Sequence, residues 1–195
     1  MNWLHIILAL CMGISLSAAC GFRVFVPLLV VSLAVRYSEL GVNEAFAWVG
    51  SDAALICLSV ATVVELLAYY IPLIDHALDV VNTPLALVAG AIITCGLLPD
   101  MPDYARWAIG IVAGAGTAGT VQIGTSTLRG MSTATTAALA NPLFSTLENA
   151  LAILGSILAI AVPVITLIGL LLAAYVVYRI IRRLRRNTPT AAPSP

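Results

Sequence analysis

Long runs of apolar residues constrain this chain more than any other feature of its sequence. Two of these runs read AALICLSVATVVELLAYYI and LAILGSILAIAVPVITLIGLLLAAYVV. A bilayer-spanning helix needs ~20 apolar residues, so each run is long enough to cross a membrane. Hydrophobic residues make up 61% of the chain and charged residues 9%, whereas soluble domains are roughly half apolar. The sequence therefore predicts an all-α, polytopic transmembrane helix bundle.

Prolines, glycines and charged residues divide the apolar sequence into about six spans, some of them broken or re-entrant. The expected spans are residues 3–36, 51–71, 84–98, 105–128, 142–162 and 163–186. We expect them to form one transmembrane domain, residues 1–186. Residues 187–195 have the composition of a disordered cytoplasmic tail.

The connections between the first three spans follow from the prolines and the acidic residues. Residues 37–51 have the character of an external loop. Pro72 ends the second span, because proline breaks the helical hydrogen-bond ladder. Residues 73–83 then form a short amphipathic connector. Thr83 and Pro84 suit the cap and first turn of the third span.

A cluster of arginines fixes the expected orientation. Five of the nine Arg residues lie in YRIIRRLRRN, directly after the last span, and the chain has no Lys. Basic clusters that flank apolar spans remain in the cytoplasm and contact lipid headgroups. Nucleic-acid binding is the alternative for such a cluster, but its position after a span argues against it. Six spans then place both termini in the cytoplasm, in a multi-pass protein of the cell inner membrane.

The N-terminal residues resemble a signal sequence, and residues 17–20 (SAAC) are similar to a lipoprotein cleavage site. However, no Lys or Arg precedes the apolar run, and apolar character resumes at Val24, so a retained first helix is favoured. Four cysteines lie in apolar stretches without a close CxxC pair, which indicates neither a disulfide framework nor a metal site. They are Cys11, Cys20, Cys57 and Cys95.

Small residues at spacing four suggest an internal repeat. They are Gly13, Ser17 and Gly21 in the first span and Gly116, Thr120 and Gly124 in the fourth. The second and fifth spans each end at a proline, Pro72 and Pro163. Three spans followed by three would make residues 1–98 and 104–186 inverted repeats, as in many transporters. Ordinary close packing of helices is the alternative explanation of the small residues.

Ionisable side chains inside the apolar spans are the main candidates for function, because charge in hydrocarbon is costly and usually faces a bundle interior or a water-filled cavity. Glu65 and Glu148 lie at similar depths in the second and fifth spans, and Tyr69 follows Glu65 on the same helix face. Arg23 is the obvious counter-charge, with Glu65 and Glu148 as its candidate partners. A purely structural ion pair, or acids kept neutral by burial, are the alternatives.

The connector carries a second polar group. Asp75, Asp79 and Asn82 follow one another at spacings of four and three, so they share a helix face. Two carboxylates one turn apart repel unless a proton or cation lies between them, and His76 can pair with Asp79. We expect a gate or an ion-recruiting face on the cytoplasmic side. A solvated polar face is the alternative.

The fourth span contains GAGTAGTVQIGTST, in which side chains such as Thr120 and Gln122 could line a path for an ion or polar solute. Such hydroxyls more often bond back to their own helix, so packing is favoured. Residues 132–141 are expected to connect this span to the fifth. The sequence contains no P-loop, Rossmann fingerprint, GxSxG elbow or zinc-ligand cluster. We therefore expect no catalytic residues, metal or cofactor.

Three motifs together resemble a family of small, mostly bacterial membrane proteins known as domain of unknown function 4126. The motifs are Pro27-Leu28-Leu29, Glu65 with Ile71-Pro72-x-x-Asp75-x-x-x-Asp79, and Ala140-Asn141-Pro142-x-x-Ser145-x-x-Glu148. The resemblance covers about residues 10 to 185 and adds Asn141 and Ser145 to the candidate site. The family pattern often has an acid where this chain has Tyr69 and Asn149. The resemblance implies a membrane protein and supplies no established activity.

The sequence supports three functional hypotheses. The first is a small proton- or cation-coupled transporter or channel for a small solute, with Glu65 and Glu148 as coupling carboxylates. The second is a membrane scaffold or assembly factor in which the charges only pair helices. The third, weaker hypothesis is a lipid-modifying enzyme using Asp75, His76 and Asp79. The expected partners are the lipid bilayer and a small solute or ion, with homo-oligomerisation left open and no nucleic acid.

Overall fold

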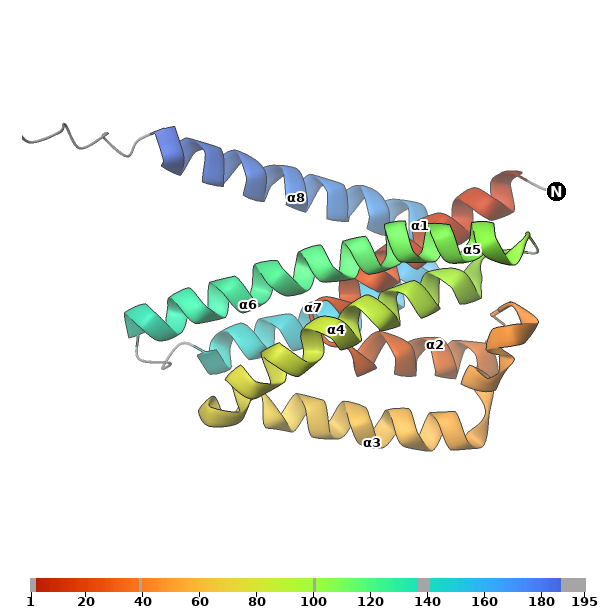
Figure 1. The fold of residues 1–195 in the computed structure, drawn as a ribbon, viewed down its shortest axis with the longest axis horizontal. Coiled ribbons are helices and arrows are strands. Elements are labelled where there is room, and N and C mark those ends of the chain that lie inside the picture. Colours follow the sequence, from red (N-terminus) through yellow and green to blue (C-terminus); the bar gives the residue numbers. More distant parts are fainter. Residues whose placement is uncertain (1–2, 39, 100, 137–140, 187–195) are drawn as a thin grey trace, which may run out of the picture.

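The computed structural model describes residues 3–38, 40–99, 101–136 and 141–186, and these ranges contain helices and no strand (Figure 1). The predicted all-α class is therefore confirmed. The α-helices are α1 (Trp3–Cys20), α2 (Phe25–Tyr37), α3 (Asp52–Ala68), α4 (Pro72–Leu97), α5 (Asp103–Ile109), α6 (Gly116–Thr136), α7 (Asn141–Ala161) and α8 (Pro163–Arg186). A 3₁₀ helix, η1 (Glu44–Gly50), precedes α3, and a π-helical segment, η2 (Gly110–Ala115), joins α5 to α6 in one continuous helix.

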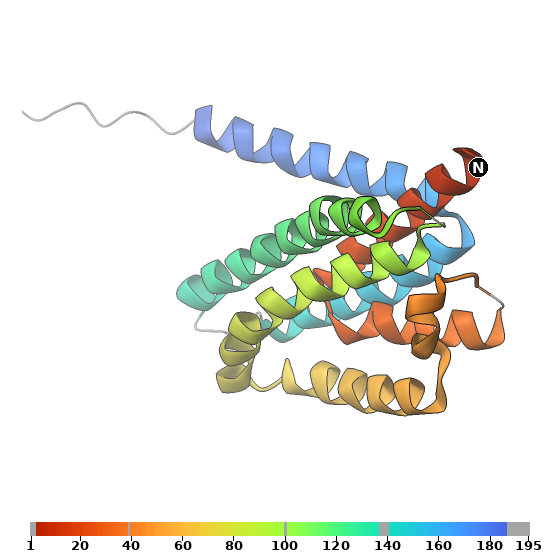
Figure 2. The same cartoon turned by 45° about the vertical axis from the view of Figure 1, so that its right-hand side comes forward.

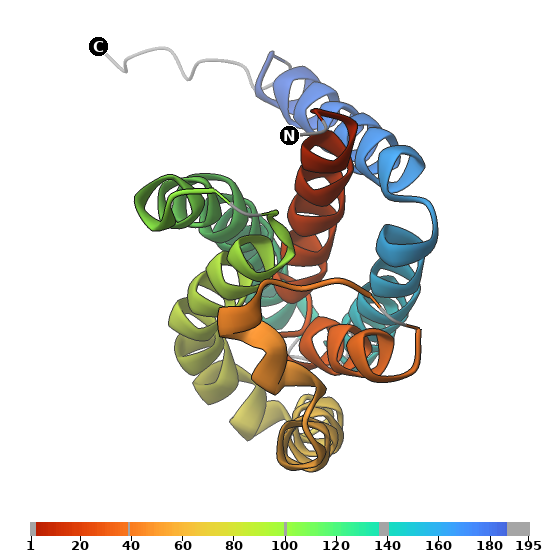
Figure 3. The ribbon, with the colours of Figure 1, turned by 90° about the vertical axis from the view of Figure 1, so that its right-hand side faces the viewer.

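Helix α1 lies at the centre of the bundle, where it contacts α2, α4, α6, α7 and α8. Figure 3, viewed along the bundle, shows these helices around α1, with α3 and α8 at opposite edges. The central position follows from the composition of α1, since its second half is buried and consists mostly of small residues. Helix α1 is therefore the central packing element of the described fold.

Small residues allow α1, α4 and η2 to cross closely. The Ser17 hydroxyl donates to the Gly90 carbonyl at 3.0 Å and lies 3.0 Å from the Thr94 hydroxyl. A Cβ on Gly90 would lie 2.6 Å from the Gly114 carbonyl oxygen, which is closer than real Cβ contacts come. The expected packing face on the first helix is therefore present, and it contacts Gly90 and Thr94 of α4 and, at Gly21, the start of α6.

The prediction of a corresponding small-residue packing face in the fourth span is wrong. A Cβ added to Gly116 or Gly124 would meet nothing within 4 Å, and Thr120 is exposed, with its hydroxyl bonded to the Gly116 carbonyl. The glycines of this helix that pack closely are Gly110 and Gly114 in the π segment, against α4 backbone and side chains, and Gly119, against the Leu87 side chain. The wider turns of a π segment change which residues face a neighbouring helix, and a spacing of four in the sequence does not reveal them.

Helix α4 runs without interruption through Pro84, so the predicted connector at 73–83 and the predicted helix start at Thr83 and Pro84 are both wrong. Pro72 occupies the first turn instead, where a missing N–H breaks no helical bond. Within a membrane bundle, an internal proline is tolerated because neighbouring helices and hydroxyl side chains compensate. The Thr83 hydroxyl bonds to the Asp79 carbonyl, and the first turns of α4 lean away from the rest of the helix (Figure 2).

The chain reverses at residues 21–24, so the predicted first span is a hairpin of α1 and the short α2. Arg23 and Val24 in this turn are buried. Non-helical backbone at membrane depth is tolerated where protein covers it. Because of this extra reversal, α1 begins at one end of the bundle and α8 ends at the other (Figure 1). The prediction that both termini lie on one side is therefore not supported.

Two expected connections also differ. The predicted loop 37–51 contains η1, whose Phe46 and Val49 are buried, and the Asn43 N–H donates to the Gly96 carbonyl. The predicted connector 132–141 begins as a continuation of α6 to Thr136. Residues 137–140 and the predicted tail, 187–195, lie outside the described residues.

Within the described ranges, three helical stretches are long and apolar enough to cross a membrane. They are Trp3–Cys20, Ala77–Leu97 and Asn141–Ala161. A fourth crossing results if η1 and α3, bent by 62° at a short break, are counted as one span. Helix α2 and residues 163–179 are apolar but shorter. These helices support an integral membrane protein; six spans are not confirmed.

Candidate functional site

The turn between α1 and α2 places Arg23 inside the bundle, where its side chain is fully buried. Its guanidinium contacts α7 through Glu148 Oε2, at 2.9 Å from Nη1, and through Asn149 Oδ1, at 2.5 Å from Nε. It also donates to the backbone carbonyls of Ser145 and Phe22. A spacing of three to four residues brings Ser145, Glu148 and Asn149 to one side of α7. Glu148 is thus one of the two partners predicted for Arg23.

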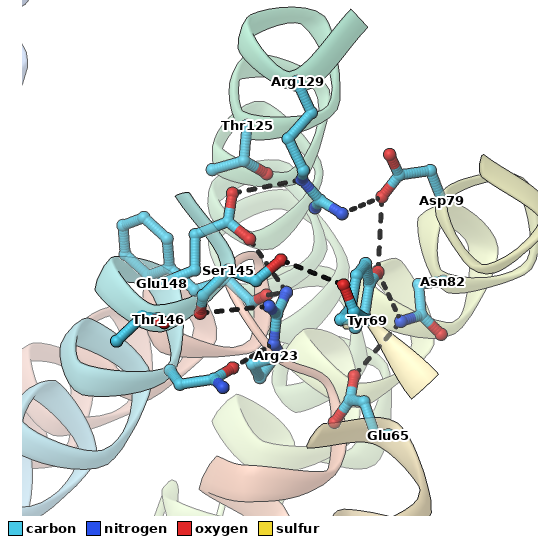
Figure 4. A network of polar contacts seen from close by, with 12 residues as sticks. Arg23, Glu65, Tyr69, Asp79, Asn82, Thr125, Arg129, Ser145, Thr146 and Glu148 are labelled. Atoms are coloured by element: carbon cyan, nitrogen blue, oxygen red, sulfur yellow. Dashed lines mark hydrogen bonds and ion pairs between the residues drawn. The ribbon is translucent and has the colours of Figure 1, made fainter. Parts of the chain in front are cut away.

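A second arginine, Arg129 of α6, reaches the same place and is also fully buried (Figure 4). Its Nη1 lies 2.8 Å from Asp79 Oδ1 on α4, and its Nε lies 3.2 Å from Glu148 Oε1. Glu148 therefore bridges two guanidinium groups, one from the α1–α2 turn and one from α6. These three ion pairs join α4, α6 and α7 to the α1–α2 turn.

The Tyr69 ring contacts both guanidinium groups. Arg23 Cζ lies 3.7 Å and Arg129 Cζ 4.5 Å from its centroid, which is within cation–π range. The phenol donates to Asp79 Oδ1 at 3.3 Å and accepts from Asn82 Nδ2 at 2.9 Å. Tyr69 therefore links the two guanidinium groups to Asp79 and Asn82 of α4.

Glu65 of α3 makes a different set of contacts. Its Oε1 accepts from the Val24 N–H at 2.8 Å, and its Oε2 accepts from the Phe25 N–H at 3.0 Å. These N–H groups begin α2, and the N-terminus of a helix carries unsatisfied donors and partial positive charge. The Asn82 amide donates to Oε1 at 3.1 Å. Glu65 therefore caps α2. Of the two candidate partners of Arg23, Glu65 makes no ion pair with it among the described side chains.

We refer to these residues as the buried cluster. They are Arg23, Glu65, Tyr69, Asp79, Asn82, Arg129, Ser145 and Glu148. In the described side chains, Arg23 and Arg129 are matched by Glu148 and Asp79. The remaining carboxylate, Glu65, is held by two backbone N–H groups and one amide. If every group is ionised, the cluster has one more negative than positive charge. The carboxylate without an arginine partner among the described side chains is Glu65.

Most of the predicted site residues meet in this cluster, and they come from α3 and its C-cap, α4, α7 and the α1–α2 turn. Asp79 and Asn82 belong to its interior, contrary to the alternative of a solvated face. The side chains of Asp75 and His76 lie outside the described residues, so the pairing of His76 with Asp79 stays a prediction.

Three predicted supporting residues lie apart from the contacts drawn in Figure 4. Asn141 is buried at the start of α7, and Gln122 is buried on α6. The Thr120 hydroxyl bonds to its own helix, as do those of Ser126 and Thr127. These bonds agree with the packing interpretation of the α6 hydroxyls rather than with a path for solute.

Sequence reasoning missed Arg129. The predicted fourth span ended at Leu128, and this boundary left Arg129 in a connection. A signal was present, because Arg129 is the single charged residue between Arg106 and Glu148. A lone arginine in a long uncharged stretch is a functional candidate when the stretch lies in a membrane.

Comparison with curated proteins and with solved structures finds no match. A match to a protein family covers residues 10–183, which include every residue of the buried cluster. The chain belongs to the family described as domain of unknown function DUF4126.

Proposed function

We propose that this protein is a small integral membrane transporter in which a proton or cation bound at the buried cluster is coupled to movement of a small solute. The observation that carries the proposal is the surplus carboxylate, Glu65, in a cluster whose other described charges are paired. A carboxylate that must be neutralised before it crosses low-dielectric surroundings provides coupling through charge alone.

The contacts of Glu65 suggest how its charge could control the bundle. Protonation removes the negative charge that holds the Val24 and Phe25 N–H groups, which weakens the cap of α2. These residues directly follow Arg23, so the turn that presents Arg23 to Glu148 would be released. Asn82 and Tyr69 extend the same contacts to Asp79 and Arg129. In this proposal Glu148 is the second coupling carboxylate, and Asp79, with Asp75, forms the gate.

The proposal extends to the symmetry and orientation of the protein. Residues 1–98 and 104–186 would be inverted repeats. The opposite directions of α3 and α7, the helices that carry Glu65 and Glu148, support this arrangement, whereas α1 and α6 run in the same direction (Figure 1). The arginine-rich end of α8 would lie in the cytoplasm, with the bundle in the cell inner membrane. A small solute or ion and the lipid bilayer are the proposed partners.

The test is to record charge movement in proteoliposomes on a solid-supported membrane after a jump in external pH. Wild-type protein should give a transient current from proton binding, and no solute is needed to see it. Glu65→Gln, which keeps hydrogen-bonding capacity but cannot ionise, should lose most of that current. Asp103→Asn removes an exposed acid outside the cluster and should leave the current unchanged. Equal currents from wild type and Glu65→Gln protein would contradict the proposal.

A scaffold or assembly role is the second candidate, and one observation favours it. The side chains of Arg23 and Arg129 are fully buried and in contact with Glu148, Asp79 and the Tyr69 ring, an arrangement that also suits helix pairing. In that case, Glu65→Gln lowers stability or recovery of a partner, and the wild-type protein shows no pH-jump current.

A further inference from the structure

A crevice of about 470 Å³ lies between α2, α3 and α4, next to the buried cluster. Its walls are apolar and include Phe25, Val60, Val64 and Leu78. Val60 and Val64 are more than half exposed on α3, so the crevice opens on a surface that faces hydrocarbon in a membrane protein. Small-molecule sites have volumes of roughly 300–1,000 Å³ and are mostly apolar with a few placed polar groups, and the crevice matches this description.

The polar groups at the crevice are Glu65 and Asn82, both of which are at least 97% buried. The Asn82 nitrogen donates to Glu65 and Tyr69, while its oxygen points away from both (Figure 4) and accepts no hydrogen bond from the described residues. Glu65 Oε2 accepts only the Phe25 N–H, and a carboxylate oxygen can accept two bonds. Two acceptors with remaining capacity thus border the crevice.

The charge at this site selects the kind of ligand. Glu65 is the carboxylate of the cluster that has no arginine partner among the described side chains, so a cation in the crevice would complement it. A primary ammonium group offers three donors on a compact charge, which suits two acceptors beside an apolar wall. An anionic or purely acceptor head would leave both oxygens without a donor.

We propose that this crevice binds a single-chain alkyl primary ammonium, with its head at Glu65 and Asn82 and its chain along Val60 and Val64. The ligand would reach the crevice from the hydrocarbon phase rather than from water. The inference goes beyond the proposed function, since binding of the amphiphile does not require that Glu65 carry protons across the membrane.

Cys57 provides a reporter for this site. It lines the crevice and is exposed, whereas Cys11, Cys20 and Cys95 are buried. In phosphatidylcholine nanodiscs, the rate of Cys57 modification by N-ethylmaleimide would be measured with dodecylamine, dodecanoate or dodecanol present. Dodecylamine should slow modification at concentrations at least about tenfold lower than the other two, because the ammonium forms charge-assisted hydrogen bonds. Cys57→Ser protein gives the background rate.

Two variants and a control test where the amine binds. Glu65→Gln should remove the preference for the amine over dodecanol while the apolar wall is retained. Because Glu65 also caps α2, Val60→Trp serves as a variant that fills the crevice without touching the cluster, and it should abolish protection. Val63→Trp, at an exposed position of α3 outside the crevice lining, should retain protection.

Equal protection by dodecylamine, dodecanoate and dodecanol would overturn the proposal, because it would identify an unselective apolar groove. Protection retained in Val60→Trp protein would also overturn it. Nanodiscs containing phosphatidylethanolamine form a separate arm, and protection by this lipid without protection by dodecylamine would assign the crevice to a lipid headgroup instead. If wild-type protein gives no pH-jump current but is protected by dodecylamine, only the transport function is rejected. If it gives the current but dodecylamine does not protect Cys57, only the amine site is rejected.

Discussion

Arg23→Met should lower the free energy of unfolding by about 3–5 kcal/mol, the range found when one partner of a buried ion pair is removed. The substitution keeps an apolar stem but leaves Glu148 with a single guanidinium and leaves the Asn149 and Ser145 oxygens without the Arg23 donor. Thermal unfolding in detergent should show a fall in Tm of roughly 10 °C for a chain of this size. Proton-dependent currents should also be lost in the Arg23→Met protein.

The matched control is Arg36→Met, which removes an ion pair with Asp52 whose side chains are 32% and 77% exposed. Exposed pairs contribute about 0–1 kcal/mol, so Tm should change little. The double variant Arg23→Met/Glu148→Met should recover part of the stability, because it no longer leaves a carboxylate buried without Arg23. Equal destabilisation by Arg23→Met and Arg36→Met would show that burial of the cluster does not govern its energetics.

Gly114→Ala should destabilise the bundle by about 1–3 kcal/mol, as overpacking of a close contact does. The new Cβ would overlap the Gly90 carbonyl oxygen and lie 2.6 Å from the Thr94 hydroxyl. Both neighbours belong to α4, and one of them is backbone, so the two helices would have to separate. Guanidinium or thermal unfolding of the purified protein measures this effect.

Gly124→Ala is the corresponding control on α6, since nothing lies within 4 Å of a Cβ at that position. It should stabilise the protein by about 0.5–1 kcal/mol, because alanine has the higher helix propensity. Opposite signs for the two substitutions are therefore expected from one chemical change. If Gly114→Ala is also stabilising, the close crossing of α4 and η2 does not contribute as the contacts indicate.

The sequence alone was sufficient for the class of protein and for much of the site. Apolar runs of membrane-spanning length specify helices, because backbone groups in lipid must be paired within the same segment. Rare charges in such runs identified Arg23, Glu65 and Glu148, and helical spacing placed Tyr69 one turn from Glu65. The cost of burying an arginine correctly favoured an acidic partner for Arg23 on another span.

Only the tertiary structure decided which charges meet. The sequence offered Glu65 and Glu148 equally as partners of Arg23. The choice depends on the α1–α2 turn, because the Val24 and Phe25 N–H groups bind Glu65, and Arg23 pairs with Glu148. The continuity of α4 through Pro84, which carries Asp79 into the bundle, likewise results from packing and not from local propensity. Local sequence sets where charge is costly, whereas the partner of each charge depends on helices far apart in the chain.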